Sequence, residues 1–136
     1  MTNALCKEKS VGLSVVLFSR RALGQHYETT AKQYLQRCGL SFIEQNFTTK
    51  TGEIDLIMRE KETLIFVEVK YRKNQNHGHA AEMVTAAKMT KLVKTANLWL
   101  LKHGLSPYDA DFRFDVIAIH HNDQHIEWIK NAITQG

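Results

Sequence analysis

The sequence has few of the residues that define several protein classes. It has two cysteines, Cys6 and Cys38, with no C-x-x-C motif and no cysteine–histidine cluster at zinc-ligand spacing. This pattern argues against a disulfide framework or a zinc site and predicts a reduced, cytoplasmic protein. One proline and seven glycines among 136 residues exclude a collagen-like chain or a disordered Pro/Gly-rich chain.

Long hydrophobic runs and several catalytic motifs are also missing. The apolar run Val11–Phe18 is too short to span a bilayer. Arg20 and Arg21 follow where an export signal would carry small residues, so no membrane association is expected. The chain has no phosphate-binding G-x-x-x-x-G-K-[ST] loop, no G-x-G-x-x-G, no G-x-S-x-G and no H-E-x-x-H. A nucleotide site, a serine triad and a zinc protease site therefore have no support.

Length and charge place the chain among single-domain proteins with a basic surface. We expect an N-terminal extension over residues 1–23 and a single domain over residues 24–136. The formal net charge is +4. Residues 1–50 contain seven basic and three acidic residues, whereas the remainder is balanced. This excess is compatible with a phosphate-bearing partner but does not demonstrate one.

Hydrophobic periodicity predicts an α/β domain. Helical spacing indicates helices over about 25–38 and 80–103. The strands are expected at Leu40–Phe47, Glu53–Met58, Thr63–Arg72, Asp111–His120 and His125–Ile129. The order of one helix, three strands, one helix and two strands predicts a mixed sheet flanked by helices.

Charged residues interrupt the two most apolar strands. Glu68 and Lys70 are two residues apart and should point to the same face of their strand. Asp55 lies on the preceding strand of the same hairpin and reaches that face if the register allows. The tripeptide Glu68–Val69–Lys70 alone is weak evidence, because a chain with this many acids and lysines contains about one acid-x-Lys triplet by chance. Its location in a buried strand carries the information.

Two carboxylates in apolar strands need a compensating charge. Mg²⁺ or Mn²⁺ would supply it, because hard cations prefer carboxylate and carbonyl oxygens. We expect Asp55, Glu68 and the backbone carbonyl of Val69 as metal ligands. Glu28, placed one turn into the first predicted helix, is a further candidate. Lys70 would lie beside the metal and donate to a water or an anion.

Three sequence blocks resemble the YraN family of bacterial proteins. They are Gly52–Ile57, Phe66–Arg72 and Arg113–Asp115, within a match that runs from about Gly24 to Ala132. That family in turn resembles the PD-(D/E)xK nucleases, which have the restriction-endonuclease-like fold, and among them the archaeal Holliday-junction resolvases. Isoleucine replaces the usual proline before Asp55, a mild departure because that proline is not a ligand.

The resemblance implies a catalytic set and a reaction. It identifies Glu28, Asp55, Glu68 and Lys70 with the nuclease core and implies metal-assisted phosphodiester hydrolysis that leaves a 5′-phosphate. The implied substrate is nucleic acid, DNA in preference to RNA, with branched or damaged DNA as a candidate. Resolvases act as two-fold dimers, so a homodimer is an expectation. Lys88 lies where related nucleases often have a polar helper.

Each of these residues also has a purely structural interpretation. Glu68 and Lys70 could form an ion pair on a partly exposed strand, and Asp55 could cap a turn or pair with Lys70. Glu28 could be a solvated glutamate near a helix start.

Other charged residues have secondary roles in the prediction. Arg72, Lys73 and Lys88 are candidate nucleic-acid contacts. Glu53 shares the face of Asp55 by alternation and could support the metal ligands from outside them or be a charge at the rim. Arg113 and Asp115 are expected to be a structural pair.

Two alternative functions remain open from the sequence. One is a nucleic-acid-binding module on the same fold without cleavage. The other is a protein-interaction scaffold that docks through Val11–Phe18.

Overall fold

Seven elements form the described part of the chain. The structure is a computed structural model that describes residues 20–72, 85–120 and 125–133. The elements are α3 (Arg20–Arg37), β1 (Ser41–Thr49), β2 (Gly52–Glu60), β3 (Thr63–Arg72), α4 (Ala86–Lys102), β4 (Phe112–His120) and β5 (His125–Ile133). Their order is the predicted one. The proposed docking segment Val11–Phe18 lies outside the described residues.

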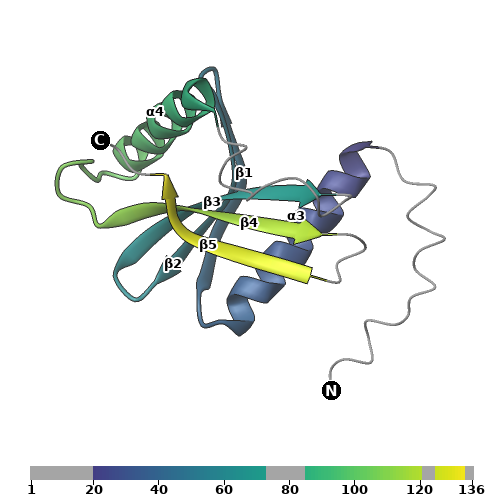
Figure 1. The fold of residues 1–136 in the computed structure, drawn as a ribbon. Helices are drawn as coiled ribbons and strands as arrows, with labels where there is room; N and C mark the ends of the chain where they lie inside the picture. Colours follow the sequence, from purple (N-terminus) through teal and green to yellow (C-terminus); the bar gives the residue numbers. More distant parts are fainter. Residues whose placement is uncertain (1–19, 73–84, 121–124, 134–136) are drawn as a thin grey trace.

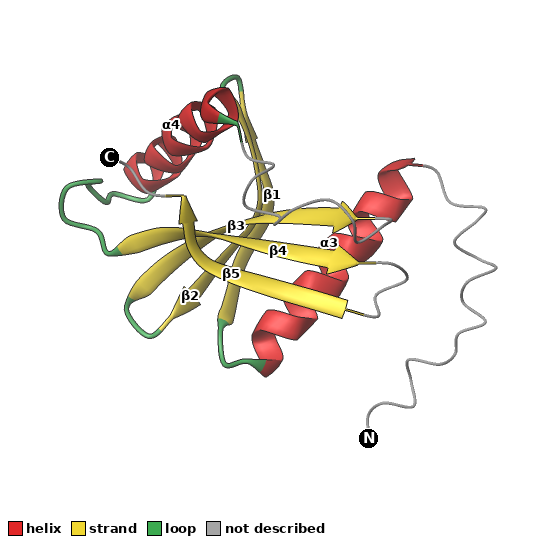
Figure 2. Cartoon of the chain, in the orientation of Figure 1, coloured by secondary structure: helices red, strands yellow, loops and turns green. Residues whose placement is uncertain are grey.

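The strands form one mixed sheet in the order β1-β2-β3-β4-β5 (Figures 1 and 2). Three neighbouring pairs are antiparallel, and β3 pairs with β4 in parallel. Parallel neighbours need a crossover connection, and α4 lies within this one. The predicted class, an α/β fold with a mixed sheet flanked by helices, is confirmed.

The two helices pack on opposite faces of the sheet. Strand alternation sends Ile65 and Val67 of β3 into a core with Ala31 and Leu35 of α3. The neighbouring residue Phe66 instead joins a second core with residues of α4. Both faces of β3 are therefore buried, as its uninterrupted apolar run predicts. Figure 1 shows α3 crossing the sheet and α4 beside the turn that joins β1 to β2.

Both helix starts differ from the predicted positions. Helix α3 begins at Arg20 rather than at residue 25, because the exposed Gly24 is accommodated inside it. Helix α4 begins at Ala86 rather than at residue 80. Thr85 has an extended backbone there, and its hydroxyl accepts the N–H of Lys88 at 3.1 Å, which is an N-cap. Residues 80–84 lie outside the described residues.

The ladder between β2 and β3 stops where the charged residues begin. Backbone pairing runs from Glu60 opposite Thr63 to Leu56 opposite Val67. At the next residue of β2, the Asp55 carboxylate accepts the backbone N–H of Val69, which lies two residues beyond Val67 on β3, at 2.8 Å. A side chain therefore replaces the strand partner and holds the two diverging strands together.

Asp115 has the structural role that its spacing from Arg113 predicts. Its carboxylate is fully buried and accepts the Arg113 Nε–H at 2.9 Å. It also accepts the indole N–H of Trp128 at 2.9 Å and the backbone N–H of Asn131 at 2.8 Å. These bonds attach the edge strand β5 to β4. In the described part of the chain, no helix is long and apolar enough to cross a membrane.

Candidate metal and nucleic-acid site

Glu68 is held by two lysines from different elements. Strand alternation places Glu68 and Lys70 on the α4 face of β3, as predicted, and their side chains are 3.3 Å apart. Lys88, in the first turn of α4, contacts the same Glu68 oxygen, Oε2, at 2.6 Å. Glu68 itself is buried, with an exposed fraction of 6%. The cap at Thr85 fixes the helix start and so sets the position of Lys88.

Three further carboxylates converge beside this group. Glu28 of α3 and Glu53 and Asp55 of β2 each offer an oxygen, and these oxygens lie within 4.8 Å of one another. We call these three residues the carboxylate triad. Since α3 begins at Arg20, Glu28 lies in the middle of the helix and not near its start. Its Oε1 is buried and has no hydrogen-bond partner among the described residues.

The carboxylates of this region repel one another. Burial, followed by repulsion from Glu68, raises the pKa of Asp55 to about 7. Burial also raises the pKa of Glu28, although a hydrogen bond from the Asn46 side chain lowers it in part. Burial and like charges both disfavour the ionised form. Asp55 and Glu28 are therefore ionised at a cost that a cation would relieve.

The two lysines have different electrostatic environments. Burial, and then the neighbouring Lys88 ammonium, lower the pKa of Lys70. Burial also acts to lower the pKa of Lys88, but its hydrogen bond to Glu68 reverses this effect, and the net pKa is raised. Lys70 is thus the ammonium that releases its proton more readily.

This arrangement can hold a divalent cation of the Mg²⁺ class. The donors are all carboxylate oxygens, which are the ligands that Mg²⁺ and Mn²⁺ prefer. Four carboxylates (Glu28, Glu53, Asp55 and Glu68) and two lysines (Lys70 and Lys88) give a formal charge of −4 + 2 = −2. The unpartnered Glu28 Oε1 adds a buried acceptor that needs a positive partner.

The predicted roles of three further residues, Val69, Arg72 and Lys73, stay predictions. The N–H of Val69 is used by Asp55, and its carbonyl as a ligand stays a prediction. Arg72 is half-buried at the end of β3, opposite His120 of β4, and its nucleic-acid contact also stays a prediction. Lys73 lies outside the described residues.

Sequence reasoning undervalued two residues of the site. Glu53 is predicted to share the face of Asp55 in a supporting or rim position, and in the structure it belongs to the triad itself. Alternation along β2 was the signal, because Glu53 and Asp55 are two residues apart. Lys88 was expected as a nucleic-acid contact or polar helper, and in the structure it pairs with Glu68. No local pattern predicts that contact, since it depends on how α4 docks.

An open groove of about 450 Å³ adjoins the triad at Glu53, and sequence reasoning missed it. Its walls are the β1–β2 turn and α4, and Glu53 belongs to both the groove and the triad. Lys50, Lys91 and Lys94 line it and make it basic. At Gly52 (φ +152°) an added Cβ would lie 3.3 Å from Thr95 Oγ1, so a larger residue would strain this wall.

The fold and site define an α/β domain with a carboxylate–lysine centre at one end of its sheet. Comparison with known proteins adds the family. The sequence model of the uncharacterised protein family UPF0102 matches residues 27–119, and the chain belongs to this family. This is the YraN family that the sequence blocks resemble.

Relatives from Vibrio species match nearly the whole chain. A UPF0102 protein of Vibrio vulnificus (strain YJ016) is 65% identical over 120 residues, which covers 88% of this chain and 98% of the relative. A UPF0102 protein of Vibrio cholerae (El Tor Inaba N16961) is 54% identical over 122 residues, covering 90% of this chain and 100% of the relative. These similarities establish the family and describe no activity.

Proposed function

We propose that this protein is a Mg²⁺-dependent endonuclease that hydrolyses phosphodiester bonds in nucleic acid, with branched or damaged DNA as the preferred substrate. The observation that carries the proposal is the convergence of the carboxylate triad with the Glu68–Lys70 pair. Carboxylates from α3 and β2 meet, and one of them, Asp55, bonds the backbone N–H of Val69, between Glu68 and Lys70 of β3. The resemblance to PD-(D/E)xK nucleases supports the same assignment of Glu28, Asp55, Glu68 and Lys70.

The residues would divide the chemistry between them. Asp55, with Glu28 and Glu68, would hold the metal, and Glu53 would complete the oxygen-rich wall. Bound there, Mg²⁺ or Mn²⁺ supplies charge stabilisation for the phosphate and a more acidic water. Lys70 would orient the attacking water or stabilise the charge that develops on the phosphoryl group. Burial and the neighbouring Lys88 lower its pKa, which makes its proton easier to give up.

The other lysines contribute position more than chemistry. Lys88 keeps Glu68 in place through its 2.6 Å contact, so that Lys70 remains available for substrate. The basic groove would receive the phosphate backbone next to the triad. A homodimer, the expectation for a junction-cleaving enzyme, would present two such sites to one branched substrate.

The groove gives a prediction about binding. We expect the double substitution Lys91→Ala/Lys94→Ala to weaken DNA binding at low salt, and to lower the slope of log K against log salt by about 2. The physical reason is that each lysine lost releases one counterion fewer on binding. Fluorescence anisotropy with a labelled duplex over a range of salt concentrations measures this slope. Lys102→Ala, at the opposite end of α4 from Lys88, is the matched control and should leave the slope unchanged.

Metal binding and cleavage together test the proposed function. Mg²⁺ and Mn²⁺ are titrated by calorimetry into the wild type and Glu68→Ala, and both proteins are then incubated with a labelled four-way junction, a nicked duplex and a linear duplex. We expect wild-type cleavage that requires metal and leaves 5′-phosphate ends. Glu68→Ala should lose cleavage and bind metal more weakly, because it removes a charge from the centre.

A variant outside the centre controls for general effects. Glu62→Gln changes an exposed carboxylate in the β2–β3 turn and should behave as the wild type. Salt-sensitive DNA binding without any product, at every metal tested, would favour the non-catalytic binding module. Absence of both metal and nucleic-acid binding would show that the carboxylates are structural.

A further inference from the structure

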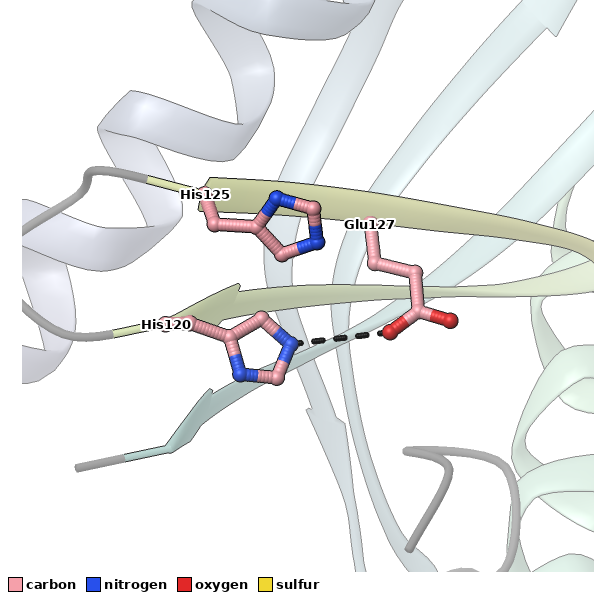
Figure 3. A group of neighbouring side chains, drawn as sticks. All are labelled: His120, His125 and Glu127. Atoms are coloured by element: carbon pink, nitrogen blue, oxygen red, sulfur yellow. Dashed lines mark ion pairs between the residues drawn. The ribbon is translucent and has the colours of Figure 1, made fainter. Parts of the chain in front are cut away.

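A second cluster of ligand-type side chains lies on β4 and β5, away from the carboxylate triad. His120 ends β4, and His125 begins β5 directly opposite it. Glu127 is two residues after His125 and therefore shares its face of the strand. Each of the three side chains offers one ligand atom, and these atoms lie within 4.8 Å of one another. Figure 3 shows the two imidazole rings and the carboxylate turned toward one another.

His120 is the buried member of this cluster, and the described residues give its ring nitrogens no hydrogen bond. Only 8% of the residue is exposed, and neither Nδ1 nor Nε2 has a hydrogen-bond partner among the described residues. Buried polar atoms are normally satisfied. Glu127 Oε1 lies 3.5 Å from Nε2, which is too far for a good hydrogen bond. The ring is thus placed for a partner that accepts its lone pair.

The spacing suits a tetrahedral metal ion. Zn²⁺ binds imidazole nitrogen and carboxylate oxygen at about 2.0–2.2 Å, so two ligand atoms on one tetrahedral ion are about 3.3 Å apart. The 3.5 Å between His120 Nε2 and Glu127 Oε1 is close to that separation. The rings of His120 and His125 have centroids 5.1 Å apart, and one nitrogen of each ring lies within 4.8 Å of a Glu127 oxygen.

We propose that His120, His125 and Glu127 form a site for a divalent transition metal ion of the Zn²⁺ class. Two imidazoles and one carboxylate select such an ion over Mg²⁺, which prefers oxygen ligands. Three protein ligands leave a fourth position for water. His125 is exposed and Glu127 is half-buried, which gives the ion an entry path. This site does not depend on the carboxylate triad being catalytic.

The location gives the site a relation to the proposed active centre. Ala118 of β4 pairs with Lys70 on one side and with Glu127 on the other. Neighbouring strands are about 4.8 Å apart, so the backbones of Lys70 and Glu127 are roughly 10 Å apart across the sheet. The carboxylate triad lies one strand further away, on β2 and α3, so the two centres would hold chemically different ions at separate places on the sheet.

Competition binding tests the site on the full chain. The protein is stripped with a chelator and kept in excess Mg²⁺ to compete for the oxygen-rich carboxylates, and Zn²⁺ is titrated against a chromogenic chelator. We expect one Zn²⁺ to bind tightly to the wild type. His125→Gln and Glu127→Gln should each weaken this binding by about 100-fold or more, since even supporting residues around a metal contribute 10–100-fold.

The variants and the controls keep the test decisive. His125 is exposed, so its substitution should leave the fold intact, which the circular dichroism spectrum checks. His103→Gln removes an exposed histidine outside the cluster and should retain wild-type affinity. Zn²⁺ should raise the Tm of the wild type and of His103→Gln but not of the two cluster variants. Absence of tight Zn²⁺ binding by the wild type, or wild-type affinity in either cluster variant, overturns the proposal.

Discussion

Lys70→Ala should reduce metal-dependent cleavage by about 10²- to 10⁴-fold, the range in which a positioned proton donor or charge stabiliser contributes. The structure explains why the effect should be confined to chemistry. Glu68 keeps its 2.6 Å contact with Lys88 when Lys70 is removed, so no buried charge is left unpaired. Lys70 is not one of the three carboxylate residues that would bind the metal. Metal affinity and DNA affinity should therefore change little.

Single-turnover cleavage of a labelled junction measures this effect directly. Calorimetry and anisotropy on the same preparations report metal and DNA binding. Lys102→Ala removes an exposed lysine in the last turn of α4 and serves as the matched control, with wild-type rates expected. Cleavage by Lys70→Ala at the wild-type rate would contradict the assignment of Lys70 to the reaction.

Asp55→Asn should make the protein more stable at pH 8 while abolishing cleavage. The pKa of Asp55 is raised to about 7 by burial and by Glu68, against an ordinary value near 3.9. The folded state then binds a proton that the unfolded state has released, so stability falls as the pH rises from about 4 to about 7. Asparagine stays neutral and can still accept the N–H of Val69. The expected gain is about 2–4 kcal/mol above pH 7.

Urea denaturation at pH 4 and pH 8 checks both the size and the sign of this effect. The two proteins should differ little at pH 4, where Asp55 is protonated in the folded state. The exposed Asp109→Asn should stay within about 0.5 kcal/mol of the wild type at both pH values. Mg²⁺ should stabilise the wild type and not Asp55→Asn. A loss of stability in Asp55→Asn at pH 8 would mean that the ionised carboxylate supports the fold.

The strands were predictable because a period of two leaves few alternatives. Once Thr63–Arg72 is assigned as a buried strand, Glu68 and Lys70 must share a face, and the structure shows that they do. The pairing of Arg113 with Asp115 follows from the same rule. The hairpin register between β2 and β3 is a local property of a short turn. These features depend on residues that are close together in the sequence, so they can be predicted from it.

The helix starts and the cross-element contacts were not predictable in the same way. An exposed glycine inside a helix costs only about 1 kcal/mol, so Gly24 does not end α3. The N-cap at Thr85 was overlooked because helix-forming residues precede it. The contact of Lys88 with Glu68 requires the packing of α4 on the sheet.

The parallel pairing of β3 with β4 has a consequence for the order of folding. The hairpin β2–β3 can form from local contacts, but β3 and β4 meet only after the intervening chain has been closed into a crossover. Helix α4 belongs to that crossover and brings Lys88 to Glu68. A nascent chain that has made the hairpin alone therefore carries Glu68 without this partner. The Glu68–Lys88 contact of the centre therefore forms only when α4 packs against the sheet, after the hairpin itself.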